Sequence, residues 1–254
     1  MDNNISSKSS DGTLHCPSAE ASYKKTATKV RRLFHRACAD FSLLEDGDRV
    51  LVALSGGKDS LELVRLLGQQ QRILKPRIQV EAAHVIMTNI PYETDRSYIK
   101  AFCEAEGVTL HLLESSFDES TDRRKTRCFL CSWNRRKALF QYATEHGFNK
   151  IALGHHNDDF IVTALMNATF EGSFSSMKPL MKMEHYPISI IRPLCLIPEE
   201  LIKNIAEHDG FQKQKTLCPY EENTRRSSIT DIFRQLEDMN PEARYSLWHA
   251  LQKQ

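Results

Sequence analysis

Hydrophobic and polar residues alternate along this chain with two different periods. Short apolar runs predict buried strands, and apolar residues that recur about every three to four positions predict amphipathic helices. The predicted strands span 48–54, 78–86, 108–115, 150–154 and 187–194. The predicted helices span 24–44, 58–73, 95–107, 133–147, 158–172, 198–210, 228–239 and 241–252. Strand and helix therefore follow each other along most of the sequence.

This order of elements predicts an α/β fold, with a Rossmann-like, mostly parallel sheet and helices on both faces. In such folds ligands bind beyond the carboxyl ends of the strands, so residues that follow a strand are the candidates for chemistry. Residues 1–24 are rich in polar residues without apolar periodicity, so we expect a disordered leader there. We expect residues 25–254 to form a single domain with a helical C-terminal part.

Composition narrows the class of protein only a little. The chain has 254 residues, of which 41% are hydrophobic and 26% charged, as in soluble proteins with a sizeable core. No apolar run approaches the roughly 18 residues that a membrane span needs. The N-terminus also lacks the apolar centre of a secretory signal. We therefore expect a cytoplasmic protein without a membrane partner.

Overall charge does not indicate a nucleic-acid partner. Lys and Arg number 34 against 33 Asp and Glu, which gives a formal net charge of +1. Nucleic-acid binding would therefore depend on local basic segments, and "DRRKTR", "NRRK" and "TRR" are the candidates. These segments can line one groove, or they can be solvated charges scattered over the surface.

A glycine-containing turn joins the first predicted strand to the next helix in "LVALSGGKDSLELV". We expect Gly56 and Gly57 to adopt positive φ and to let the backbone approach an anion closely. The free N–H groups at the start of the helix favour phosphate, and Lys58 adds a positive charge. Asp59 can hold Mg²⁺, and the serines at both ends of Ser55–Ser60 add hydroxyl donors. The turn is thus predicted to bind a phosphate group.

The turn differs from a Walker loop, which would need glycine where Val52 stands. Its Ser-Gly-Gly-Lys-Asp-Ser sequence instead resembles the PP-loop of the N-type ATP pyrophosphatases, a family with an adenine nucleotide alpha-hydrolase-like fold. Members of that superfamily bind ATP, transfer AMP to a substrate oxygen and release pyrophosphate. The resemblance implies ATP and Mg²⁺ as cofactors. A plain glycine-rich turn is the simpler reading, but the strand–turn–helix context argues against it.

Three of the seven cysteines form a candidate metal site. Cys128 and Cys131 form a C-x-x-C directly before the predicted helix 133–147, and Cys218 lies far downstream. Two thiolates at this spacing can bind one metal, and nearby positive charge favours the thiolate form. A [4Fe–4S] cluster with one open iron, a zinc site completed by histidine and a redox dithiol all fit. Spacing does not decide between them.

The segment "CFLCSWNRRKALFQYATEHGFNKIALGHHNDD" closely resembles the tRNA 2-thiocytidine synthetases of the TtcA type. Their pattern is a PP-loop, a C-x-x-C before paired arginines, Gly-His-His-x-Asp-Asp, an Ile-Arg-Pro-Leu strand and a late cysteine. The chain shows these five elements in this order, and the resemblance covers about Lys29 to Leu251.

The resemblance implies iron–sulfur-dependent thiolation of tRNA. ATP would adenylate O2 of an anticodon-loop cytidine, and sulfur carried on the open iron would then replace AMP at C2. A cysteine desulfurase would supply the sulfur. The implied partners are thus tRNA and a desulfurase, and a homodimer is one candidate for the oligomeric state.

The same resemblance assigns roles to residues of this chain. The implied cluster ligands are Cys128, Cys131 and Cys218. The implied nucleotide-binding residues are Ser55, Gly56, Gly57, Lys58, Asp59, Ser60, Gly154, His155 and Asp159. The implied catalytic residues are Lys58, Asp59, Lys137 and Asp158, with Lys137 stabilising the adenylation transition state as a fixed cation.

Simpler structural roles exist for several of these residues. Asp158 and Asp159 can be carboxylates that stabilise the start of a helix. His155 can be a hydrogen-bonded structural histidine, and Lys137 a solvated helix residue. Arg135 and the arginine after it can be surface charges, although their place beside the C-x-x-C suggests contacts to tRNA phosphate.

The late cysteine departs from the pattern that many relatives follow. Those relatives carry a second C-x-x-C there, whereas this chain has Lys215 three residues before Cys218 and Glu221 three residues after it. The following "PYEENTRR" favours Cys218 as the second cysteine of that pair.

Two other functions stay open. A PP-loop ligase of the lysidine-synthetase type needs no metal-binding cysteines, so the C-x-x-C argues against it. A non-enzymatic ATP-binding module with a zinc or redox site is the other. The acidic and basic residues Lys58, Asp59, Asp158 and Asp159 are all present, which argues against this module.

Overall fold

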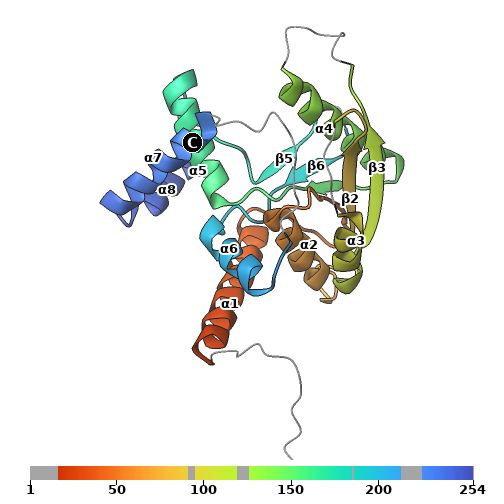
Figure 1. The fold of residues 1–254 in the computed structure, drawn as a ribbon, viewed down its shortest axis with the longest axis horizontal. Helices are drawn as coiled ribbons and strands as arrows, with labels where there is room; N and C mark the ends of the chain where they lie inside the picture. Colours follow the sequence, from red (N-terminus) through yellow and green to blue (C-terminus); the bar gives the residue numbers. More distant parts are fainter. Residues whose placement is uncertain (1–16, 91–94, 119–125, 185, 213–224, 254) are drawn as a thin grey trace, which may run out of the picture.

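A parallel sheet forms the centre of the computed structural model, which describes residues 17–90, 95–118, 126–184, 186–212 and 225–253. In these residues six strands form one sheet in the order β3-β2-β1-β4-β6-β5 (Figure 1). The strands are β1 Arg49–Ala53, β2 Gln79–Met87, β3 Thr109–Ser115, β4 Lys150–Ala152, β5 Leu180–Lys182 and β6 Ser189–Ile191. Only the pairing of β5 with β6 is antiparallel. The predicted Rossmann-like, mostly parallel sheet is confirmed.

Helices cover both faces of the sheet. Within the described residues they are α1 Pro17–Asp40, α2 Lys58–Gln70, α3 Arg96–Ala105, α4 Arg127–Glu145, α5 Asn157–Met166, α6 Glu199–His208, α7 Arg225–Met239 and α8 Ala243–Gln252, with a π-helical turn at Asn167–Glu171. None of the helices in the described part of the chain combines the length and the apolar character that crossing a bilayer requires.

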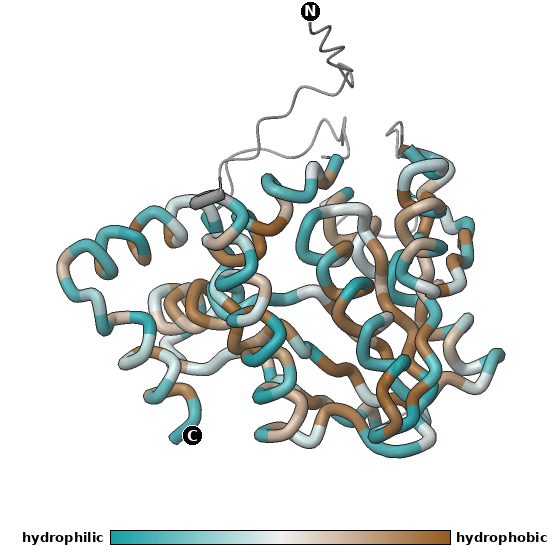
Figure 2. The backbone as a smooth tube through the Cα atoms, turned by 90° about the horizontal axis from the view of Figure 1, so that it is seen from below, coloured by the Kyte–Doolittle hydropathy of each residue, from teal (hydrophilic) through white to brown (hydrophobic). Residues whose placement is uncertain are grey.

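The core divides into two layers because side chains of a strand point alternately to its two faces. In β1, Val50 and Val52 pack into a cluster with α1, α2, α3 and α6. Leu51 between them faces the other side and packs in a cluster with Phe140 of α4. Figure 2 shows the hydrophobic residues gathered along the interior, with hydrophilic residues on the outer turns of the helices.

The order of the strands places a crevice between β1 and β4. After β1 the chain runs through α2, β2, α3 and β3 along one half of the sheet. It then crosses through α4 to β4, which pairs with β1 on its other side. The segments that leave β1 and β4 therefore diverge, and ligands bind at such points in open α/β sheets. Both predicted loops, Ser55–Ser60 and Gly154–Asp159, lie at this crevice.

The C-terminal helices form a layer of their own beside α5. Phe233 and Ile229 of α7 pack against Ile161 and Val162 of α5, and α8 joins this cluster through Leu247. In Figure 1 α7 and α8 lie on the side of α5 away from the sheet. The division into a leader and one domain stays a prediction, since residues 1–16 lie outside the described part of the chain.

Several boundaries differ from the sequence prediction. The helix α4 begins at Arg127 and not at 133, because Thr126 caps it by accepting a hydrogen bond from the Phe129 amide at 3.3 Å. Cys128 and Cys131 thus lie within the first two turns of α4 and not before the helix. The helix α1 begins at Pro17, within the segment expected as leader. The short strand β5 was not predicted, because three residues carry too little pattern.

Candidate functional site

The Ser55–Ser60 loop leaves β1 as a compact turn before α2. Gly56 has a φ of +88°, whereas Gly57 is extended with a φ of −77°, so only one of the two glycines takes the positive φ predicted for both. The hydroxyl of Ser60 donates to the Gly57 carbonyl at 2.8 Å and lies 3.1 Å from the Ser55 hydroxyl. Gly57 is the N-cap of α2 and supplies no side-chain cap. The first amides of α2 therefore keep the arrangement that favours an anion.

The Gly154–Asp159 segment leaves β4 and touches the first loop. A Cβ atom on Gly154 would lie 3.2 Å from the Asp59 carbonyl carbon and from the Ser60 nitrogen. These neighbours are backbone atoms, so a larger residue in place of Gly154 would have to push the two segments slightly apart. The predicted nucleotide-binding residues of both segments are thus brought together.

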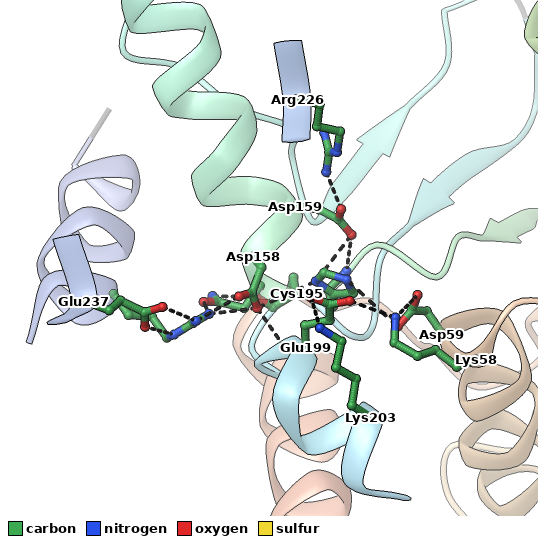
Figure 3. A network of polar contacts seen from close by, with 12 residues as sticks. Lys58, Asp59, Asp158, Asp159, Cys195, Glu199, Lys203, Arg226 and Glu237 are labelled. Atoms are coloured by element: carbon green, nitrogen blue, oxygen red, sulfur yellow. Dashed lines mark hydrogen bonds and ion pairs between the residues drawn. The ribbon is translucent and has the colours of Figure 1, made fainter. Parts of the chain in front are cut away.

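Lys58 lies at one end of a network of charges (Figure 3). Its ammonium group lies 3.1 Å from Asp59 and 2.9 Å from Glu199, and Lys203 contacts the same glutamate at 3.0 Å. Burial would lower the pKa of Lys58, but the two carboxylates outweigh it and raise that pKa. Burial would raise the pKa of Glu199, but its hydrogen bonds from Lys58 and Lys203 bring it down to about 2. Lys58 and Glu199 are therefore both charged at neutral pH.

Asp158 is held by the C-terminal helices. Arg244 of α8 forms an ion pair with it at 2.8 Å, and Asp158 accepts the backbone N–H of Glu199 at 2.7 Å. Burial would raise the pKa of Asp158, but the hydrogen bond and charge of Arg244 keep it below the ordinary value. Figure 3 shows the resulting chain of contacts from Glu237 of α7 to Lys58. This chain joins α8 to the Ser55–Ser60 loop.

Asp159 is held in the same way by the other C-terminal helix. Arg226 of α7 pairs with one oxygen of Asp159, and the other oxygen accepts the backbone N–H of His156 at 2.8 Å. The imidazole of His156 lies between two carboxylates, 3.5 Å from Asp159 and 3.9 Å from Asp59. Asp158 and Asp159 thus help to hold the start of α5, which was one interpretation of the sequence. Their arginine partners, however, come from α7 and α8.

Some buried polar atoms at the crevice make no hydrogen bond in the described part of the chain. Within the described residues, Asp59 Oδ1 and His155 Nδ1 have no hydrogen-bond partner. Burial lowers the pKa of His155 to about 4, so its ring is neutral at neutral pH. Buried polar groups are usually hydrogen-bonded, and atoms left over at a crevice suit a ligand. The residues present thus fit a bound nucleotide and its metal ion.

Two cavities adjoin the charged network. One of about 90 Å³ is lined by Ser55 of the loop, His84 of β2 and Arg135 of α4 among others. The other, of about 350 Å³, lies between α5, α6 and α7 and is lined by charged residues of both signs, including Asp159 and Arg226. A larger cavity of about 690 Å³ is lined by residues of neither loop. We therefore place the site at the first two.

A comparison with known families identifies the family of this chain. The model of the PP-loop domain matches residues 23–248. The chain belongs to the PP-loop family. The Ser55–Ser60 loop, whose sequence resembles a PP-loop and which we call by that name, lies where a strand meets a helix at the crevice.

Curated relatives within the PP-loop family are tRNA sulfurtransferases. The tRNA-cytidine(32) 2-sulfurtransferase of Bdellovibrio bacteriovorus is 36% identical, over 85% of this chain and 84% of that protein. The proteins of the same name from Legionella pneumophila and Stenotrophomonas maltophilia are 34% and 35% identical over 87% and 88% of this chain, and 81% and 74% of their own length. Their names agree with the predicted resemblance.

The solved structure of a tRNA thiolase shares the fold of this chain. The U34-tRNA thiolase NcsA from Methanococcus maripaludis, solved with its [4Fe–4S] cluster, superposes with a TM-score of 0.74 at 25% identity. The match covers 91% of this chain and 79% of that protein. A thiolase with an iron–sulfur cluster is therefore among the structures that this PP-loop chain resembles.

Two of the three predicted cluster ligands lie together. Cys128 is exposed and Cys131 half-buried in the first two turns of α4, where a spacing of three residues puts side chains on neighbouring positions of one helix side. Paired, accessible thiols are a donor set that suits an iron–sulfur cluster. Cys218 lies outside the described residues, and within the described part no three metal-binding side chains gather. The ligand set stays a prediction.

The structure separates two residues of α4 that the sequence placed together. Arg135 lines the 90 Å³ cavity beside the PP-loop, whereas Lys137 is exposed on the helix surface. The catalytic role of Lys137 therefore stays a prediction without a contact to the site. Residues that sequence reasoning did not assign to the site are Glu199, Lys203, Arg226 and Arg244. The position of Glu199 after β6, at the carboxyl edge of the sheet, is the one signal that pointed to it.

Proposed function

We propose that this protein is an ATP-dependent tRNA sulfurtransferase that forms 2-thiocytidine in the anticodon loop. One observation carries the proposal: Ser55 of the PP-loop and Arg135 of the cysteine-bearing helix α4 line the same cavity. A site that activates a base and a site that delivers sulfur must serve one atom in turn, so they must adjoin. The family and its curated relatives support the same reaction.

The first step of the proposal is activation of the base. The base oxygen O2 attacks the α-phosphorus of ATP, the bond to the β-phosphate oxygen breaks, and pyrophosphate leaves with the electron pair. The amides at the start of α2 and the ammonium of Lys58 would bind the phosphates. Lys58 already carries its charge in a partly buried position, which stabilises negative charge that develops on pyrophosphate.

A carboxylate of the site would bind a metal ion in this step. Mg²⁺ prefers oxygen ligands and commonly bridges one or two carboxylates and phosphate groups. Asp59 keeps one buried oxygen without a hydrogen bond within the described residues, and Asp159 lies across His156 from it. We assign the metal to Asp59. Asp158 and Asp159, which are paired with Arg244 and Arg226, would instead orient the starts of α5 and α6.

The second step replaces the activated oxygen by sulfur. Sulfur bonds to C2, the C2–O2 bond breaks, and AMP departs with the oxygen. Cys128, Cys131 and Cys218 would hold a [4Fe–4S] cluster, which would supply a soft metal centre for the sulfur. A cysteine desulfurase as sulfur source, a homodimer and a cytoplasmic location belong to the same proposal.

Anaerobic reconstitution tests this function. The purified chain would be given iron and sulfide, and then ATP, Mg²⁺, sulfide and tRNA that lacks 2-thiocytidine. We expect 2-thiocytidine in the nucleosides by mass spectrometry, with AMP and pyrophosphate formed in equal amount. We expect the Cys218→Ala variant to lose iron and acid-labile sulfide. Pyrophosphate release without thionucleoside, together with zinc in place of iron, would redirect the assignment to a ligase.

A further inference from the structure

Two exposed aromatic side chains lie beside the cysteine pair. Phe129 and Trp133 are 47% and 57% exposed, and they occupy successive turns of α4. Their rings are nearly parallel, with an angle of 9° between the planes and 6.4 Å between centroids. Large aromatic residues are normally buried, so an exposed pair that stacks in one direction indicates a contact surface.

The surroundings of the two rings are basic. At 100° per residue, Arg136 and Lys137 lie within the same sector of α4 as Trp133, and both are exposed. From Arg127 to Thr144 the helix contains four cationic residues and no carboxylate. We call Phe129, Trp133, Arg136 and Lys137 the ring stripe. This stripe combines flat apolar rings with positive charge, which is complementary to the bases and phosphates of a nucleic acid.

The direction of α4 places this stripe at the proposed site of chemistry. The helix connects β3 to β4, so its first turns lie at the carboxyl edge of the sheet, as the PP-loop does. Arg135, one turn beyond the cysteines, lines the cavity beside Ser55. One side of the helix thus faces the PP-loop, and the ring stripe, about 160° away around the helix, faces outward.

We propose that Trp133, with Phe129 behind it, is a stacking platform for an unpaired base of the RNA substrate. This inference rests on the proposed function and adds to it the kind of RNA that the chain binds: a single-stranded loop. Bases of a loop can be splayed out onto aromatic rings, whereas bases of a duplex cannot. Arg136 and Lys137 bind the adjacent phosphates. The rings share the first two turns of α4 with the cysteines but face another side of the helix, so the base that stacks is not the cytidine that is modified.

An RNA loop fits this surface better than a protein partner does. A protein that docks on exposed rings needs an apolar surface of its own, and it uses the positive charge beside the rings only if that surface has an acidic rim. Nucleic acid offers both a flat π-face and negative charge in each repeating unit.

Tryptophan fluorescence gives a direct test, because the chain has only two tryptophans. Trp248 packs against Phe160 and Phe41, so the Trp248→Phe variant leaves Trp133 as the sole reporter at modest cost in packing. This variant would be titrated with an anticodon stem–loop RNA and with a fully paired duplex of equal length. We expect saturable quenching of Trp133 by the stem–loop and no more than weak quenching by the duplex.

Affinity measurements complete the test. Loss of one base–aromatic stack predicts a fall in affinity of the Trp133→Ala variant for the stem–loop of between about 5-fold and 100-fold. Trp133→Phe should restore most of it. The control is Tyr245→Ala, which removes an equally exposed ring on α8. Thermal melting of each variant checks that the fold is intact.

The outcomes separate this inference from the proposed function. If Trp133 fluorescence does not respond, or Trp133→Ala binds the stem–loop as tightly as the parent, the platform is excluded even when 2-thiocytidine forms. If the parent binds the loop through Trp133 but forms no 2-thiocytidine, the platform stands and the reaction is wrong. Unchanged RNA affinity with slower sulfur delivery from a protein donor would assign the rings to that donor.

Discussion

The PP-loop region and the start of α4 serve the same proposed reaction but are built in opposite ways. Around Lys58 each charged side chain is half-buried and paired, with partners from α5, α6, α7 and α8. Around Cys131 the helix is exposed, with thiols, rings and cations directed outward. Charge pairs hold the first region in a fixed arrangement, whereas the second region is an exposed surface.

The difference follows from what each region has to bind. ATP is small and highly charged, and its transition state gains most from dipoles and charges that are fixed before it arrives. A tRNA loop is large and must enter and leave, so its contacts stay near the surface. Four substitutions should affect the two regions differently, and the largest expected effect comes first.

A substitution at the cysteine pair should abolish sulfur transfer and leave ATP binding nearly unchanged. We expect Cys131→Ser to abolish sulfur transfer, with a loss of more than about 100-fold, because a hydroxyl is a poor ligand for iron. ATP affinity should change less than about twofold, since the residue lies outside the charged network. Nucleoside mass spectrometry and equilibrium ATP binding measure the two effects. Ser132→Ala, in the same exposed turn, is the matched control, and a parallel loss of ATP binding would contradict the separation.

Within the nucleotide region, Lys58 should dominate the chemistry. Lys58→Met removes a fixed charge at the phosphates and should slow pyrophosphate release by about 100-fold or more. The control Lys100→Met alters an exposed lysine of α3 that pairs with Glu104 at 3.8 Å, and it should leave the rate unchanged. Equal rates for Lys58→Met and wild type would remove this lysine from the mechanism.

The C-terminal helices should stabilise the nucleotide region through Arg244. Arg244→Ala leaves Asp158 and Glu237 without their shared partner and should lower the free energy of unfolding by ~2 kcal/mol. Arg234→Ala removes an exposed arginine of α7 that pairs locally with Asp231, and its effect should stay within about 0.5 kcal/mol. Urea denaturation measures both. Similar values for the two variants would mean that the contact to α8 adds no stability.

The smallest effect concerns pH. Glu199 has a pKa of about 2 in the folded protein against 4.5 as its ordinary value, so its ion pairs add stability above pH 4.5 that is lost as the pH falls toward 2. The Glu199→Gln variant should therefore be less stable than wild type by on the order of 1 kcal/mol from pH 5 to 8. The gap should narrow below about pH 4.5 in urea denaturation. A gap that widens with acid would reverse the assigned sign.

Local sequence was sufficient for the parts of the site that are local. The strand–turn–helix of Val52 to Lys58 was predicted because each step has its own signal, an apolar run, two glycines and an amphipathic helix. The pair Cys128 and Cys131 was found by spacing. The start of α4 was missed because its C-x-x-C was taken as a segment before the helix, and Thr126 as cap decided the boundary.

Contacts between distant segments could not be predicted. Glu199 reaches Lys58 across 141 positions, and Arg244 reaches Asp158 across 86. No periodicity or spacing connects such pairs, because each residue alone resembles a solvated charge. Only the topology of the sheet, which brings β6 and the C-terminal helices to the crevice, makes them partners.

The sequence by itself thus determined the α/β fold, the PP-loop and the cysteine pair, since these depend on interactions between residues near in the chain. The tertiary structure alone decided how the acidic residues are neutralised and which residues of α4 face the site. It placed Arg135 at the cavity and left Lys137 and Trp133 on the surface. The physical reason is that burial and charge pairing are properties of the packed chain, and they are set when helices from separate parts of the sequence meet.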